Sequence, residues 1–124
     1  MQWIKGITTK LIGDKGEAQA AKFLQENNLI VIGKNFSSKF GELDLVCQDQ
    51  EVYVFVEVKY RQSSQFGGAI STISKKKQQK LKLCASFYFQ QLGLNEYNTP
   101  CRFDVVALQG SLDKPQITWL KNAF

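Results

Sequence analysis

The chain has 124 residues, a net charge of +5 and no histidine. Its length and its 44% content of hydrophobic residues predict one folded domain over residues 1–124 and argue against disorder. The lack of histidine excludes Ser-His-Asp catalysis, Cys-His catalysis and imidazole metal sites, so carboxylates and lysines remain as the candidate catalytic groups.

The first predicted element is a helix that begins at about Asp14 or Lys15 and ends at Asn27. On a helical wheel, Glu17 lies within roughly 60° of the apolar positions of this helix. These positions are Ala20, Ala21 and Leu24. A carboxylate in an apolar stripe needs a partner, because burying it unpaired costs several kcal/mol or forces its protonation. Glu17 is therefore either an early-turn acid favoured by the helix dipole or a group at a metal site.

Three strands are predicted next, at residues 29–32, 40–47 and 52–60, with turns at residues 33–35 and 48–51. The third strand is β-branched and aromatic almost throughout, which is typical of a strand buried on both faces. Glu57 and Lys59 nevertheless share one face of it, because strand side chains alternate.

The hairpin between the second and third strands brings a second acidic residue towards Glu57. Asp44 can lie beside Glu57, and Glu42 occupies the same face as Asp44. Magnesium prefers such oxygen ligands and is commonly held by one or two carboxylates. The alternative is a structural ion pair, in which Glu57 and Lys59 pair only with each other or with an adjacent arginine.

A polar stretch at residues 62–68 precedes a second helix, which is predicted to begin after the N-cap Ser74 and to end at Gly93. One stripe of this helix is mostly apolar, with Lys77 and Gln78 extending it towards the N-terminus. The stripe consists of Leu81, Cys84, Ala85, Tyr88 and Leu92. Further apolar residues on other faces predict that the helix is covered twice, by a homodimer partner or within the monomer.

Two strands, at residues 101–108 and 117–120, complete the chain. The three cysteines, Cys47, Cys84 and Cys101, show no C-x-x-C spacing, so we expect reduced, structural thiols and no zinc site. No signal peptide or membrane-spanning stretch is apparent, which predicts a cytoplasmic protein that does not bind membranes.

Positive charge is concentrated between residues 59 and 82, a span that contains no acidic residue. The basic residues of this span are Lys59, Arg61, Lys75, Lys76, Lys77, Lys80 and Lys82. Three of these lysines occupy the first turn of the second helix, where the helix dipole disfavours cations. A solvated lysine face is one interpretation. A surface that binds the phosphates of nucleic acid is the one we favour, because the block follows the carboxylate strands directly.

Motifs along nearly the whole chain resemble those of the UPF0102 family, also called the YraN family. They are Gly16-Glu17-Ala18, FGELDL at residues 40–45, VFVEVK at 54–59, FGG at 66–68, Lys77-Gln78, RFDVV at 102–106 and NAF at 122–124. That family looks like a minimal branch of the PD-(D/E)xK restriction-endonuclease-like superfamily, similar to archaeal Holliday junction resolvases. The resemblance implies an α/β fold with a mixed β-sheet flanked by α-helices. In one departure, Ser37 stands where the family usually has an arginine.

Resemblance and carboxylates together predict a nuclease that hydrolyses DNA, branched or junction DNA included, with Mg²⁺ or Mn²⁺ as cofactor. The expected metal ligands are Asp44, Glu57, Glu17 and Val58, with Glu42 as a further candidate. The expected catalytic residues are Asp44, Glu57, Glu17 and Lys59, and Lys59 orients the attacking water and stabilises charge on the phosphate. The expected contacts to nucleic acid are Arg61, Lys75, Lys76, Lys77 and Gln78.

Two alternatives to a nuclease remain open at this point. One is a non-catalytic nucleic-acid-binding module that keeps the fold and the basic face. The other is an interaction subunit that acts only within a complex, an interpretation favoured by the apolar second helix.

Overall fold

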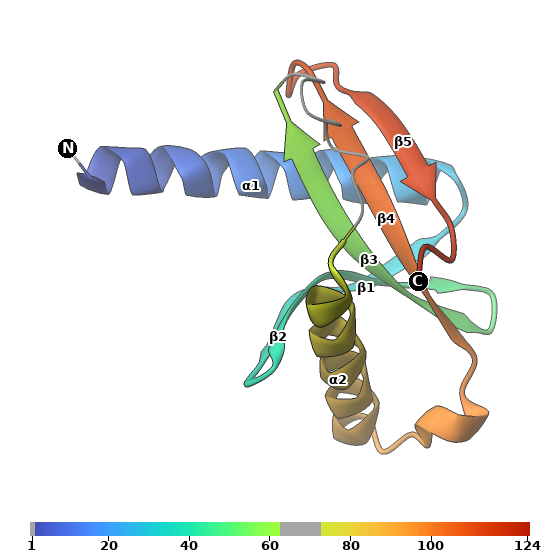
Figure 1. Ribbon diagram of the computed structural model, residues 1–124. Helices are drawn as coiled ribbons and strands as arrows, with labels where there is room; N and C mark the ends of the chain where they lie inside the picture. Colours follow the sequence, from blue (N-terminus) through green and yellow to red (C-terminus); the bar gives the residue numbers. More distant parts are fainter. Residues whose placement is uncertain (1, 63–72) are drawn as a thin grey trace.

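The computed structural model describes the backbone of residues 2–62 and 73–124, and side chains from residue 12 onward within these ranges (Figure 1). In chain order the elements are α1 (Gln2–Glu26), β1 (Ile30–Ser38), β2 (Gly41–Asp49), β3 (Val52–Arg61), α2 (Lys75–Gln91), the short 3-10 helix η2 (Glu96–Asn98), β4 (Cys101–Gln109) and β5 (Gln116–Leu120). The predicted order of one helix, three strands, a helix and two strands is confirmed.

The strands form one mixed sheet in the order β1-β2-β3-β4-β5. Strands β3 and β4 are parallel, and the other neighbouring strands are antiparallel. Antiparallel neighbours can be joined by short turns, whereas a parallel pair needs a longer crossover, and α2 provides it between β3 and β4. The predicted fold class, an α/β mixed sheet flanked by helices, is therefore confirmed.

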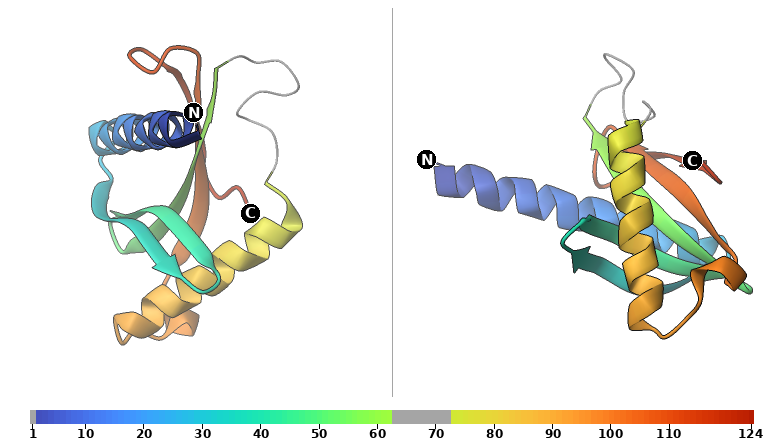
Figure 2. Two further views of the ribbon diagram at one scale, coloured as in Figure 1. Left: turned by 90° about the vertical axis from the view of Figure 1, so that its left-hand side faces the viewer. Right: turned by 60° about the horizontal axis from the view of Figure 1, so that its bottom comes forward.

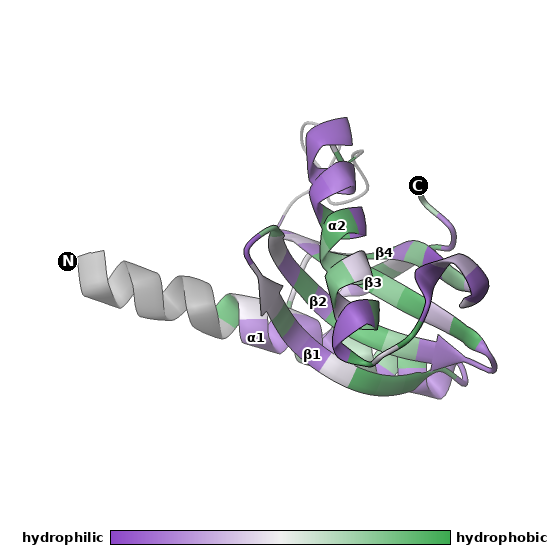
Figure 3. Ribbon diagram, turned by 90° about the horizontal axis from the view of Figure 1, so that it is seen from below, coloured by the Kyte–Doolittle hydropathy of each residue, from purple (hydrophilic) through white to green (hydrophobic). Residues whose placement is uncertain are grey.

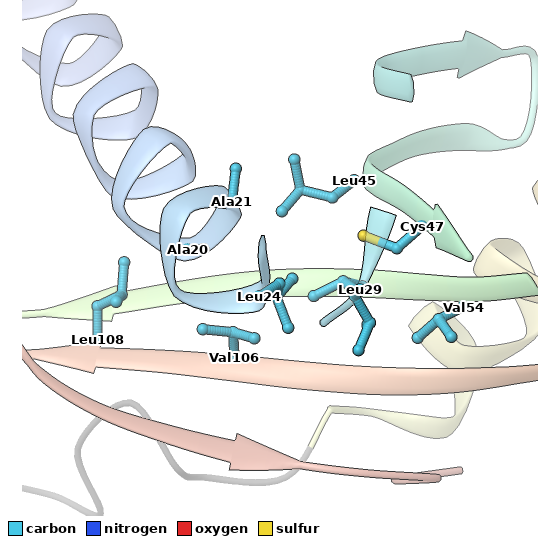
Figure 4. Packing of buried hydrophobic residues seen from close by; sticks show 10 residues of the cluster. Ala20, Ala21, Leu24, Leu29, Leu45, Cys47, Val54, Val106 and Leu108 are labelled. Atoms are coloured by element: carbon cyan, nitrogen blue, oxygen red, sulfur yellow. The ribbon is translucent and has the colours of Figure 1, made fainter. Parts of the chain in front are cut away.

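The two helices cover opposite faces of β3, which explains its nearly continuous apolar sequence (Figure 2). Val54 and Val56 face the cluster formed with α1, and Phe55 faces the cluster formed with α2. On the α1 side, Ala20 and Leu24 are fully buried against the sheet (Figure 4). Full burial of a leucine side chain stabilises the fold by about 1.5–3 kcal/mol.

The cluster between α2 and the sheet is largely aromatic. The Phe55 ring centroid lies 5.4 Å from that of Phe89 and 5.3 Å from that of Phe103. The predicted stripe of α2 was wrong at two positions, because Phe89 is buried whereas Leu92 is 49% exposed. Leu92 is the C-cap residue, beyond the last turn of α2, so it leaves the face that meets the sheet.

The β1–β2 hairpin separates from β3 at Asp44, and this separation creates the candidate site. In the pairing of β2 with β3, Asp49 lies opposite Val52 and Leu45 lies opposite Val56. Before Leu45 the hairpin turns away from β3 (Figure 1). Side-chain alternation breaks at the same point: Leu43 packs on the α2 side, whereas Leu45, two residues later, packs on the α1 side.

Two predicted boundaries were wrong. The first helix begins at Gln2, about 12 residues before the predicted start, and its earlier turns project beyond the sheet (Figure 1). The prediction was late because the apolar stripe marks only the part of the helix that meets the sheet. The predicted turn at residues 33–35 lies inside β1. Gly33 adjoins a β-bulge there, and a Cβ atom at Gly33 would lie 3.7 Å from Cβ of Val46.

The ends of α2 follow the prediction. Ser74 is the N-cap and accepts a hydrogen bond from the Lys77 backbone N–H at 3.2 Å, and Gly93 adopts a left-handed φ of 72° just after the helix. Most of the predicted polar stretch, including the FGG motif, lies outside the described residues.

The cysteines are free thiols, as expected, with Cys47 and Cys84 buried and Cys101 exposed. Burial raises the pKa of Cys47 to about 12, which agrees with an unreactive structural thiol. Within the described residues, neither helix combines the length and the apolar composition needed to cross a membrane.

Candidate metal centre

Three carboxylates from two elements meet where the hairpin leaves β3. Glu17 of α1, Glu42 of β2 and Asp44 of β2 each place one carboxylate oxygen within 4.8 Å of the other two. All three were predicted from the sequence as candidate ligands, but Glu57, which was predicted to lie beside Asp44, is not one of the three. Their role as metal ligands stays a prediction.

Asp44 is fixed by a backbone hydrogen bond across the gap between β2 and β3. The Val58 backbone N–H donates to Asp44 Oδ2 at 2.9 Å, so the side chain replaces a ladder partner that the diverging strand no longer offers. Burial, followed by the negative charge of Glu57, raises the pKa of Asp44 to about 7. The ionised form of Asp44 is therefore disfavoured by its surroundings.

Glu57 is the most buried carboxylate near the site, with 8% of its side chain exposed. It lines an apolar pocket with Leu43, Leu81 and Phe124. Its Oε1 forms an ion pair with Lys77 Nζ of α2 at 2.7 Å, and Lys77 is 54% exposed. Lys77, which the sequence analysis assigned to nucleic acid, thus contacts a predicted metal ligand directly.

Lys59 follows Glu57 on the same strand face and lies among other cations. Burial, helped by the charges of Arg61 and Lys77, lowers the pKa of Lys59, while Glu57 opposes this shift. A lowered pKa near the carboxylate of Glu57 makes Lys59 a candidate functional residue.

Sequence reasoning missed Asn35. With its amide nitrogen turned towards the carboxylates, Asn35 donates to Glu17 Oε1 and to Glu42 Oε1, both at 2.9 Å. Burial raises the pKa of Glu17, and the hydrogen bond from Asn35 opposes that shift. Asn35 lies in a segment that was predicted as a turn, where asparagine is common. Its presence there therefore did not indicate that it lies close to Glu17 and Glu42.

The predicted nucleic-acid-binding residues lie along the start of α2 and the end of β3. Lys76, Lys77 and Lys80 line a surface groove together with Ser74. The first turns of α2 are hydrophilic and extend past the sheet (Figure 3). Gln78 instead donates to the Ile73 backbone carbonyl at 2.9 Å, and Arg61 donates to the carbonyl of Tyr60, also at 2.9 Å.

A second group of charges, around Asp104, has a structural role. Asp104 is fully buried and accepts hydrogen bonds from Arg102 Nε, from Trp119 Nε1 and from the Asn122 backbone N–H. Arg102 also pairs with Asp49 at 3.0 Å. These bonds join β4 to β5 and to the final residues. The sequence feature that could have indicated this group is an aspartate inside the apolar run of β4.

The carboxylate cluster offers a donor set suited to a hard divalent cation. The groups that approach one another are oxygen donors from Glu17, Glu42 and Asp44, with Glu57 near enough to influence the pKa of Asp44. Mg²⁺ and Mn²⁺ prefer such oxygen ligands, whereas zinc and copper sites use imidazole or thiolate. A cation here would offset both the burial and the repulsion by Glu57 that raise the pKa of Asp44.

Comparisons with known proteins identify the family. Residues 16–108 match the model of "Uncharacterised protein family UPF0102". The chain is 58% identical over 114 residues to a UPF0102 protein of Colwellia psychrerythraea, covering 90% of this chain and 88% of that protein. It is 48% identical over 114 residues to one of Pseudomonas putida, covering 90% and 91%. It is 40% identical over 121 residues to one of Photorhabdus laumondii, covering 98% and 93%. The chain therefore belongs to the UPF0102 family.

Proposed function

We propose that this protein is a metal-dependent nuclease that hydrolyses phosphodiester bonds in DNA. The proposal rests on the convergence of Glu17, Glu42 and Asp44 within 4.8 Å, in a site where burial and a further carboxylate raise the pKa of Asp44 to about 7. Clustered, partly buried carboxylates destabilise a fold, so they are uncommon away from functional sites, where perturbed pKa values cluster.

Asp44, Glu57 and Glu17 would hold Mg²⁺ or Mn²⁺, with Glu42 as a further ligand, and Val58 can add only its backbone carbonyl oxygen. When bound, the ion would polarise the scissile phosphate and acidify an attacking water. The chain's own contribution is geometry: the Val58 N–H fixes the orientation of Asp44, and β3 presents Glu57 and Lys59 on one face. Lys59 would orient the water and stabilise charge that develops on the phosphate.

Lys77 links the metal site to the DNA surface. Its ammonium group neutralises Glu57 through Oε1, so movement of Lys77 away from Glu57 would free that oxygen for a metal ion. Because Lys77 is half-exposed and lines the groove with Lys76 and Lys80, a DNA phosphate can take the place of Glu57 as its partner.

The same ion pair favours one alternative function. If Lys77 neutralises Glu57 permanently, the protein is a nucleic-acid-binding module that keeps the fold and the basic groove without cleavage. The two functions differ in their need for a metal ion.

The test is cleavage of labelled duplex, flap and four-way-junction DNA with Mg²⁺ or Mn²⁺. We expect the wild type to cut at least one of these and Asp44→Asn to cut none. Asparagine can still accept the Val58 hydrogen bond but lacks the charge that a metal ion needs. Binding without cleavage by the wild type would establish the alternative instead.

A further inference from the structure

The neutral side chain of Asn35 lies between two of the clustered carboxylates. With the amide nitrogen turned towards the carboxylates, Asn35 donates to Glu17 Oε1 on α1 and to Glu42 Oε1 on β2, both at 2.9 Å, and its two hydrogens suffice for both bonds. One side chain on β1 thus bridges a helix and a strand, and it uses one oxygen of each carboxylate for the bridge.

The backbone of Asn35 explains how its amide reaches this position. Asn35 has a left-handed φ of 54°, and its neighbours on β1 pair with Leu45 and Leu43, the neighbours of Asp44 on β2. Asn35 and Asp44 therefore lie opposite each other, at the point where the alternation of β2 breaks. Asparagine tolerates left-handed backbone better than most other residues and also supplies two N–H donors. Glycine would satisfy only the first requirement.

We infer that Asn35 is a positioning residue of the candidate metal centre. It holds Glu17 and Glu42 at a fixed separation and reduces their repulsion, and it leaves the second oxygen of Glu17 available to a cation. This inference rests on the proposed function, because positioning matters only if the carboxylates bind a metal ion. Groups that orient metal ligands in this way typically change metal affinity by roughly 10- to 100-fold when removed.

The decisive substitution is Asn35→Gly, which keeps left-handed backbone accessible and removes the side chain with its amide. The matched control is Asn28→Gly, the same exchange at another asparagine with a left-handed φ, 73°, in the turn between α1 and β1. Both variants are first compared with the wild type by circular dichroism and thermal unfolding. Mn²⁺ affinity is then measured by calorimetry, and the bound ion is examined by electron paramagnetic resonance.

We expect Asn35→Gly to bind Mn²⁺ at least about 10-fold more weakly than the wild type, with an altered resonance spectrum of the bound ion, and Asn28→Gly to match the wild type. Equal affinity and spectra for Asn35→Gly and the wild type would overturn the inference and leave the proposed function intact. So would an unfolded Asn35→Gly beside a folded Asn28→Gly, because Asn35 would then serve the fold. A wild type that binds no Mn²⁺ would overturn the proposed function and this inference together.

Discussion

Asp44 makes the metal-free protein sensitive to pH. Its pKa of about 7 in the folded state exceeds the ordinary value of 3.8, so the folded state holds this proton more tightly than the unfolded state does. The stability that results is present below about pH 4 and is lost as the pH rises through about 7.

Asp44→Asn should therefore become more stable, relative to the wild type, as the pH rises. Between about pH 5 and pH 8 we expect a relative gain on the order of 2 kcal/mol in the free energy of unfolding, because asparagine does not ionise. Urea unfolding with a chelator present measures it. A constant difference across this range would show that Asp44 is ionised throughout.

Asp104 presents the opposite case, a buried charge with a full set of partners. Asp104→Ala should reduce the free energy of unfolding by about 3–5 kcal/mol, because Arg102, only 18% exposed, and Trp119 both lose an acceptor. Asp113→Ala is the control, since Asp113 forms an exposed pair with Lys15, and its unfolding midpoint should barely change. If both substitutions had the same small effect, the network around Asp104 would not hold β4 and β5 together.

Individual residues also show what a sequence can reveal about a site. Asp44 and Glu57 were found because charges interrupt apolar strands. Asp104 interrupts β4 in the same manner and was not singled out as a structural group. Its partner Arg102 lies two residues away on the same strand, but its partner Trp119 comes from strand pairing that the sequence does not specify. Asn35 could not be found, since its role depends on a left-handed backbone and on the approach of α1 to β1.

At the scale of elements, Lys77 of α2 contacts Glu57 of the proposed metal site and also lines the lysine groove. Lys77→Gln should tighten Mn²⁺ binding roughly fivefold, the equivalent of about 1 kcal/mol, because Glu57 loses a competing cation. Lys76→Gln removes the same charge from the same helix and groove, and we expect it to leave the affinity close to wild type. Calorimetry compares the Mn²⁺ affinities of the three proteins. Weaker or unchanged binding by Lys77→Gln would contradict the competition between Lys77 and the metal ion for Glu57.

Element types were predicted correctly, and the errors lie at boundaries set by tertiary contacts. Ser74 and Gly93 defined α2 through local chemistry, namely a side-chain acceptor and a left-handed φ. The start of α1 was predicted too late, because the apolar periodicity of the sequence covers only the part of the helix that contacts the sheet. Gly33 suggested a turn, although a strand with a bulge uses glycine as well.

At the scale of the whole molecule, Lys76, Lys77 and Lys80 line one groove, which the proposed function makes a surface for DNA. DNA binding should weaken steeply with salt through counterion release, and the double variant Lys75→Ala/Lys76→Ala should reduce the slope of log K against log salt by about 2. The control Lys22→Ala/Lys114→Ala has the same net charge but spares α2. Fluorescence anisotropy over a salt series measures both, and equal slopes would show that binding depends on net charge alone.

The central claim is that this site performs phosphodiester hydrolysis, and single-turnover cleavage by Lys59→Ala tests it most directly. Lys59 shares a strand face with Glu57, and the claim gives it a role in the transition state rather than in binding. With the DNA that the wild type cuts best, we expect Lys59→Ala to cut at least about 100-fold more slowly while its DNA and Mn²⁺ affinities stay near wild type. Lys59→Arg should not restore cleavage, because guanidinium is larger and planar. Cleavage by Lys59→Ala at the wild-type rate would contradict the role of Lys59, and a wild type that cuts no duplex, flap or four-way-junction DNA would contradict the claim.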